Sequence, residues 1–249
     1  MEIFDSHLHL ESHVDLDVSI ANLIENCHLA GVAGGLIICM QNDPWEFKAV
    51  AEQIGLQGNF LFAINPDLNG SKADLIRSIK EGKMAGAVAL KIHPRLQRIN
   101  LLAKKVDYLV RLAEDLDLPV IICSFDDGSW SRFGLTSDQF LRLADNFPNV
   151  KFLWAHAGGH NVLDFMFMAR RTSNVYLDSS FTQSYFFKGS VLEDLNYASE
   201  SLPTRFMFGT DFEGRTYPES VGNLVDFYLQ RNKNRELFFG KNFREFFGY

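Results

Sequence analysis

Cysteine is scarce in this chain, and an excess of positive charge is missing. Among 249 residues there are three cysteines, Cys27, Cys39 and Cys123, an odd number that forms no C-x-x-C pair. A disulfide framework is therefore not expected, and a reducing, cytoplasmic location is the simpler prediction. The net charge is −7, and no block of lysines and arginines is present, which argues against nucleic acid or an anionic membrane as partner. The balance is compatible with a small-molecule partner, including an anion held by a few local arginines.

Long apolar runs and targeting patterns are missing as well. No apolar run reaches the roughly 20 residues of a membrane-spanning helix, and no basic segment precedes an apolar one near the start, so no signal peptide is expected. The nucleotide-binding pattern G-x-G-x-x-G does not follow the first predicted strand. Composition shows no break, linker or low-complexity segment. A single domain over residues 1–249 is the prediction.

The chain does contain a regular alternation of short apolar strands and segments with helical spacing. Eight strands are predicted, at residues 3–6, 35–40, 60–64, 85–92, 119–123, 150–155, 175–177 and 205–209. Such alternation predicts a parallel sheet covered on both faces, and eight units favour an α/β fold closed as a (β/α)8 TIM barrel over an open sheet. Helical segments at 218–230 and 235–247 end the chain. Many of the 23 phenylalanines lie there, which favours a helix over the barrel base, with a homodimer patch as the alternative.

The first strand carries the pattern around which the functional prediction is built, Asp-Ser-His-Leu-His at residues 5–9. Side chains alternate along a strand, so His7 and His9 share one face, with Asp5 expected one pair deeper on it. Two imidazoles on one face are placed to hold one metal ion. In a closed barrel the last strand lies beside the first and brings Asp211 next to both histidines. Three potential metal ligands are thus expected to converge.

Further candidates stand at the ends of the fourth, fifth and sixth strands, where barrels of this class carry their active sites: Lys91, His93, Arg95, Cys123 and His156. Three of them have a plainer interpretation. Lys91 could extend along the barrel rim, Cys123 could be a small buried hydrophobe, and His156 could be a hydrogen-bonded core histidine. Asp211 could likewise cap a loop or the following helix.

Taken in order, these motifs resemble the amidohydrolase superfamily, and within it the compact metal-dependent hydrolases. The matching pieces are residues 5–9, 86–94, 154–159, 208–212 and 239–243. The resemblance implies a barrel with a divalent metal, usually zinc, at its mouth. It implies that His7, His9 and Asp211 are metal ligands and that Asp211 also handles the proton of the metal-bound water. It places His156 beside that water or the substrate.

One position departs from the family pattern, which has a histidine ligand at the end of strand five. Here Pro-Val-Ile-Ile at 119–122 is followed by Cys123. A thiolate can bind zinc but leaves it a weaker Lewis acid. Either Cys123 ligates, or His156 replaces it, or the affinity for metal is low. A related deoxyribonuclease-like branch shares the opening motif, but its glutamate-bearing motifs are absent.

The leading functional hypothesis is hydrolysis of an amide, lactone or ester bond of a small molecule by metal-activated water. Asp211, with His156 as a second candidate, would accept the proton. Lys91, His93 and Arg95 would bind a substrate carboxylate or stabilise an oxyanion. Carboxylation of Lys91 to bridge two metals is an alternative that the missing histidine disfavours.

Two other functions are compatible with the sequence. The first is a non-oxidative decarboxylase of a small aromatic acid on the same scaffold, for which aromatic walls such as Trp130, Phe181 and Tyr185 are expected. The second is a binding protein or degenerate enzyme that has lost its metal at Cys123.

Overall fold

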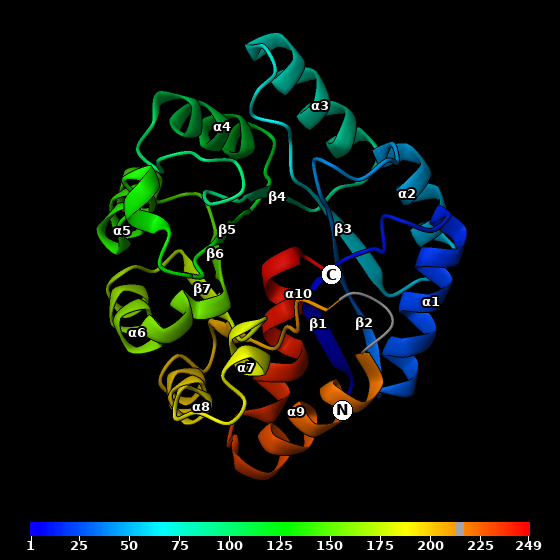
Figure 1. The fold of residues 1–249 in the computed structure, drawn as a ribbon, viewed down its shortest axis with the longest axis vertical. Coiled ribbons are helices and arrows are strands. Elements are labelled where there is room, and N and C mark those ends of the chain that lie inside the picture. Colours follow the sequence, from blue (N-terminus) through cyan, green and yellow to red (C-terminus); the bar gives the residue numbers. More distant parts are fainter. Residues whose placement is uncertain (213–216) are drawn as a thin grey trace.

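A computed structural model describes residues 1–212 and 217–249, and its strands form a ring around a central axis (Figure 1). The described strands are β1 (Ile3–Leu8), β2 (Val32–Cys39), β3 (Phe60–Ile64), β4 (Ala89–Ile92), β5 (Val120–Cys123), β6 (Phe152–Ala155), β7 (Val175–Asp178) and β8 (Phe206–Met207). They form one sheet in chain order, and each strand is parallel to the next.

The two edges of this sheet meet, which closes the barrel. The backbone N–H of Ser6 donates to the carbonyl of Phe208 at 3.0 Å, and that of Asp211 donates to the carbonyl of His7 at 2.8 Å. The (β/α)8 TIM barrel predicted from the sequence is confirmed. The C-terminal ends of the strands, called the mouth below, are the end at which β8 places Asp211 beside β1.

Helices surround the ring, apart from α10, which lies at its base. They are α1 (Leu16–Leu29), α2 (Phe47–Gly55), α3 (Lys72–Met84), α4 (Lys104–Asp115), α5 (Ser137–Asn146), α6 (Val162–Arg171), α7 (Thr182–Tyr185), α8 (Val191–Ser201), α9 (Tyr217–Arg231) and α10 (Asn242–Phe247). Short 3-10 turns at Trp130–Phe133 and His156–Asn161 and a π-helical turn at Leu237–Lys241 complete the described elements. Across residues 1–212 and 217–249, no helix is long and apolar enough to cross a membrane.

The barrel interior is closed at its base by α10, which lies inside the ring in the view down the barrel (Figure 1). The ring of Phe243 stacks on Phe4 at the start of β1 with centroids 5.1 Å apart, and Phe246 meets Tyr176 at the start of β7, 4.8 Å away. These rings belong to an apolar cluster that fills the barrel, separate from the larger one between barrel and helices. The phenylalanine-rich end of the chain therefore covers the base, and only the mouth remains open to polar chemistry.

The fourth strand is shorter than the sequence predicts, and turn geometry explains the difference. Residues 85–88 were expected to be extended, but Ala85 caps α3 and Gly86 adopts a φ of 103°. The N–H of Gly86 bonds back to the carbonyl of Lys83, and that of Ala87 to Gly82. The apolar run therefore begins in a helix-ending turn, and pairing starts only at Ala89.

An irregularity in β1 corrects the expected position of Asp5. Phe4 packs inside the barrel and Leu8 packs against the helices, although residues four apart share a face of a regular strand. The register of β1 shifts between Asp5 and Leu8, which accounts for the change of face. Asp5 therefore does not share the face of His7.

Candidate metal centre

Three of the predicted side chains converge on one carboxylate oxygen at the mouth. Oδ1 of Asp211 lies 3.0 Å from Nε2 of His9 and 3.2 Å from Nε2 of His7. His7 is 1% exposed, whereas His9 and Asp211 are 18% and 20% exposed. The cluster is thus buried on the barrel side and open toward the mouth.

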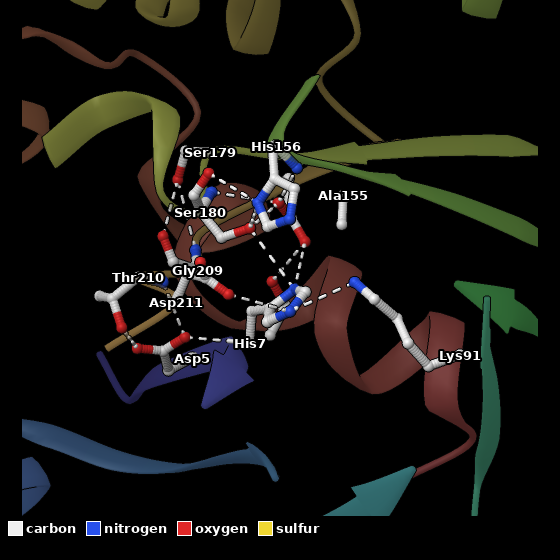
Figure 2. A network of polar contacts seen from close by, with 12 residues as sticks. Asp5, His7, Lys91, Ala155, His156, Ser179, Ser180, Gly209, Thr210 and Asp211 are labelled. Carbon is white, nitrogen blue, oxygen red and sulfur yellow. Dashed lines mark hydrogen bonds and ion pairs between the residues drawn. The ribbon is translucent and has the colours of Figure 1, made fainter. Parts of the chain in front are cut away.

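Backbone geometry after β8 holds Asp211 in this position. Asp211 adopts a φ of 65°, uncommon for a residue with a side chain. Asp5 anchors the preceding residue, because its carboxylate accepts from the N–H and hydroxyl of Thr210 at 2.9 and 2.6 Å. The Asp5 side chain thereby ties the end of β8 to β1 and does not enter the cluster (Figure 2).

A second carboxylate, Asp178 at the end of β7, supports the cluster from below. Its Oδ2 lies 3.6 Å from Nδ1 of His7 and accepts a bond from the Ser6 hydroxyl at 3.3 Å. Its Oδ1 accepts from the backbone N–H groups of His156 and Ser180 at 2.8 and 3.0 Å and from the Ser180 hydroxyl. Asp178 is fully buried, so these donors replace the water that a charged carboxylate would otherwise require.

His156 is held against His7 by strained backbone and by hydrogen bonds. It begins a left-handed run, with φ values of 71° at His156 and 45° at Ala157. Its Nδ1 lies 2.9 Å from the Ser180 hydroxyl and 3.1 Å from the Ser180 carbonyl, and its own carbonyl accepts from Thr182 at 2.6 Å. The rings of His156 and His7 are 4.9 Å apart, centroid to centroid. Strain held by this many bonds is typical of functional sites.

The charges of the cluster follow from burial and from these contacts. Burial, assisted by the nearby Lys91, lowers the pKa of His7 to about 3, so its imidazole is neutral at pH 7. Burial by itself would raise the pKa of Asp178, but the bond and charge of His7, together with His156, hold it at about 2. Burial is likewise outweighed at Asp211, where His7 and His156 lower the pKa of the carboxyl group.

The donor set fits a divalent metal. Because Asp178 lies beside Nδ1 of the neutral His7, the ring proton is on Nδ1 and Nε2 carries a lone pair. This lone pair faces Oδ1 of Asp211, which is unfavourable unless a positive charge lies between the two atoms. Ligand atoms about 2.1 Å from one cation lie roughly 3.0–3.4 Å apart at tetrahedral or octahedral angles. The separations of Asp211 from His7 and His9 match this range. Two imidazoles and a carboxylate are ligands that zinc and manganese accept.

The predicted residues of β4 approach the cluster to different extents. Lys91 is 1% exposed, and its Nζ lies 3.3 Å from Nε2 of His7 (Figure 2). Burial lowers the pKa of Lys91, although the nearby thiol and carboxylates oppose the shift. Arg95 lies farther out at the rim, 29% exposed, and donates from Nη1 to Asp127 at 2.6 Å.

Cys123 lies at the mouth end of β5 and faces two histidines. Burial alone would raise the pKa of its thiol, but hydrogen bonds and charge interactions with His93 and His156 bring it well below the usual value. The same thiol raises the pKa of His156 against the effect of burial. Among the described residues, two groups of side chains could share a metal: His7, His9 and Asp211, or His7, His156 and Asp178. Cys123 belongs to neither group.

Aromatic side chains next to His156 differ in part from those predicted. Trp130 is 6% exposed, stacks on Phe140 and donates from its indole to the Phe125 carbonyl, so it is a core residue and lines no mouth. Phe181 does lie near His156, and Phe125 joins it, with its ring 4.8 Å from Phe181 and 6.3 Å from His156. Tyr185 lies farther out, against Phe125 and Phe181, and is largely exposed.

Asp178, Ser179 and Ser180 directly follow the strand predicted at residues 175–177 but are not among the predicted site residues. The signal was the same as for the predicted residues, since polar side chains at the end of an apolar strand point into the mouth. Phe125 follows Cys123 by two positions and offered no polar signal at all. Its place beside the site depends on the loop after β5.

Comparisons with known proteins identify the family of the chain and support its barrel fold. An amidohydrolase family model matches residues 37–249, and no curated protein sequence matches the chain. An uncharacterized TIM-barrel protein from Bordetella bronchiseptica superposes with a TM-score of 0.80 at 16% identity, over 100% of this chain and 99% of that one. Dihydroorotase from Campylobacter jejuni gives 0.66 at 16% identity, over 100% and 83%.

A third solved structure is a 5-carboxyvanillate decarboxylase from Novosphingobium aromaticivorans, complexed with manganese and 4-hydroxy-3-methoxy-5-nitrobenzoic acid. It superposes with a TM-score of 0.63 at 14% identity, over 91% of this chain and 79% of that one. At such low identities the three structures support the fold alone.

Proposed function

The chain belongs to the amidohydrolase family, and we propose that it is a metal-dependent hydrolase of an amide, lactone or ester bond in a small molecule. The observation that supports this most directly is the shared oxygen of Asp211, which lies 3.0 Å from His9 and 3.2 Å from His7. Packing of the barrel core does not account for two imidazoles and a carboxylate meeting at the open end. A ligand bound by all three side chains would account for it.

A divalent metal, most simply one zinc ion, would be held by His7, His9 and Asp211. Bound there, it would supply a Lewis acid for the scissile carbonyl and lower the pKa of water toward neutrality. Asp211 has a second oxygen, Oδ2, which would take the proton of the attacking water. Because His7 and His156 keep the Asp211 carboxyl ionised, it is ready to act as a base at neutral pH.

The neighbouring nitrogen-bearing side chains would bind the charged groups of the substrate and transfer protons. His156 stands beside His7 with Nδ1 engaged by Ser180, and its ring also hydrogen-bonds the Cys123 thiol, a contact that a substrate would have to displace. His156 would donate to the leaving group or share in taking the proton. Lys91, His93 and Arg95 would stabilise an oxyanion or hold a substrate carboxylate. Of these three, Arg95 best suits a carboxylate, because its guanidinium is held at the rim by Asp127.

A decarboxylase of a small aromatic acid is the second candidate. The rings of Phe125, Phe181 and Tyr185 lie within 5.5 Å of one another, centroid to centroid, close to His156. They form a surface on which a planar ring could stack. In that reaction the same metal site would orient the carboxylated ring, and carbon dioxide would be released without attack by water.

Metal analysis of protein purified without chelator is the first experiment. About one equivalent of zinc or manganese supports an enzyme, whereas no metal after incubation with zinc, manganese or cobalt supports a metal-free binding protein. The loaded protein is then tested on amides, lactones and esters for new acid groups, and on hydroxybenzoates for carbon dioxide. His7→Ala serves as the control, because hydrolysis that survives this substitution does not use the proposed site.

A further inference from the structure

A groove opens beside the candidate metal centre, between the segment that follows β7 and the first half of α9. Its volume is about 400 Å³, within the usual range for small-molecule sites. Most of its lining is apolar, and the remaining described lining residues are neutral serines and an asparagine. The residues that matter for the argument are Phe181, Tyr185, Phe212, Ser220 and Asn223.

Two walls of this groove also border the metal centre. Phe212 follows Asp211 directly, and its backbone carbonyl accepts from the N–H of His9 at 3.3 Å. On the other side, the ring of Phe181 lies 6.2 Å from that of His156, centroid to centroid. The groove therefore adjoins the metal centre at Phe181 and Phe212, the side from which a molecule bound at Asp211 would extend into it.

Phe181 is held in an unusual backbone conformation at this boundary. Its φ of 55° is a rare value for a bulky residue. The N–H of Phe181 donates to the carbonyl of Thr210 at 3.0 Å, and its carbonyl accepts from the N–H of Tyr185 at 2.8 Å. These bonds keep the ring between His156 and the groove. Backbone strain retained in this way is often part of a binding site.

We infer that the groove binds an uncharged apolar group of the substrate, alkyl or aryl, remote from the reacting bond. That this occupant is part of a substrate rests on the function proposed above; the preference for apolar groups rests on the groove alone. A charged group would lose much of its hydration there and gain at most hydrogen bonds from neutral side chains, because no oppositely charged side chain is among the described lining residues. Each methylene group that enters should tighten binding about fourfold.

The test measures binding to the full chain as purified, by ligand-observed NMR with butan-1-ol, pentan-1-ol and hexan-1-ol. The expected dissociation constant falls about fourfold per added methylene. Asn223 is exposed at the groove, so Asn223→Trp should fill it without disturbing the fold and should abolish the gain with chain length. Tyr197→Ala, which removes an exposed aromatic ring of α8 outside the groove, is the matched control and should retain the gain.

Equal affinities for the three alcohols would overturn the inference. So would the same fall in the dissociation constant per methylene in Asn223→Trp and in a second variant that fills the groove, Ser220→Phe. Hexanoate should bind more weakly than hexan-1-ol, and tighter binding of hexanoate would contradict an uncharged occupant. Because alcohol binding involves no reaction and no metal, it can fail while the hydrolase assay succeeds, or succeed while that assay fails.

Discussion

His9 Nε2 lies 3.0 Å from Oδ1 of Asp211, although 202 residues separate the two in the chain. The contact exists because the barrel closes β8 against β1, and it joins the first and last functional segments of the sequence. A divalent cation is the simplest ligand that both side chains, together with His7, could bind. The predictions below test this arrangement and the groups that support it.

Removal of either imidazole should abolish stable metal binding while the barrel stays folded. His7→Ala and His9→Ala leave only two of the three convergent ligands, and a two-ligand site loses its metal on dialysis. Metal content by mass spectrometry and far-UV circular dichroism are the measurements. His28→Ala, on α1, is the control and should keep its metal. Full metal content in either variant would show that the replaced histidine is not a ligand.

Asp211→Asn should reduce turnover by several orders of magnitude and metal content by much less. The amide oxygen still coordinates weakly, but the neutral side chain cannot take a proton from water. Metal content and turnover are measured on the same preparation with any substrate that the panel identifies. Turnover near that of the unmodified protein would rule out Asp211 as the base.

Asp178→Asn should weaken metal binding about 10- to 100-fold, although Asp178 is not a proposed ligand. The carboxylate beside Nδ1 of His7 favours the tautomer whose Nε2 is free to coordinate. Nitrogen-15 NMR of the histidines should show a changed His7 tautomer ratio. Asp127→Asn removes a rim carboxylate that bonds Arg95 and should change neither measurement. An unaltered metal affinity in Asp178→Asn would show that Asp178 does not orient His7 for metal binding.

Cys123→Ala should leave the metal content unchanged, because the thiol faces His93 and His156 and lies outside both candidate ligand groups. Contacts with His93 and His156 bring the pKa of the Cys123 thiol well below its usual value, so this thiol should be alkylated faster than one whose pKa is raised by burial. Both thiols are buried, so alkylation is measured in mild denaturant. Cys39, whose pKa is raised by burial, is the comparison and should be alkylated more slowly. Loss of metal in Cys123→Ala would show that the Cys123 thiolate is a metal ligand.

The metal-free protein should lose stability as the pH falls from about 6.5 to about 3. In the unfolded chain His7 has the ordinary histidine pKa of 6.5, whereas in the folded protein burial lowers its pKa to about 3. The unfolded state binds the extra proton in this window, so the His7 contribution falls by about 1.4 kcal/mol per pH unit at most. Urea unfolding across this range, compared with His7→Gln, measures it. Identical slopes for the two proteins would contradict a depressed pKa.

Much of the architecture could be predicted from residues alone, because the signals are local. Short apolar runs such as Leu-Ile-Ile-Cys at 36–39 and Val-Ile-Ile-Cys at 120–123 alternate with helical spacing, and both lie in strands. The positions of His7, Lys91 and Asp211 after such runs place them at one end of a barrel whatever the details of its loops. Strand ends and ring order were therefore accessible to sequence reasoning.

The tertiary structure decided how individual side chains are aimed. Asp5 turned toward Thr210 because β1 is irregular, and His156 and Asp211 reach the cluster through positive φ angles that no residue pattern announces. Asp178 and Phe125 became neighbours of His7 and His156 only through packing of the strand ends. Trp130 lies in the core, where its ring stacks on Phe140. Periodicity reports which face a regular element buries, but bulges, strained turns and loop packing depend on contacts between residues far apart in the chain, so their geometry emerges only when the barrel closes.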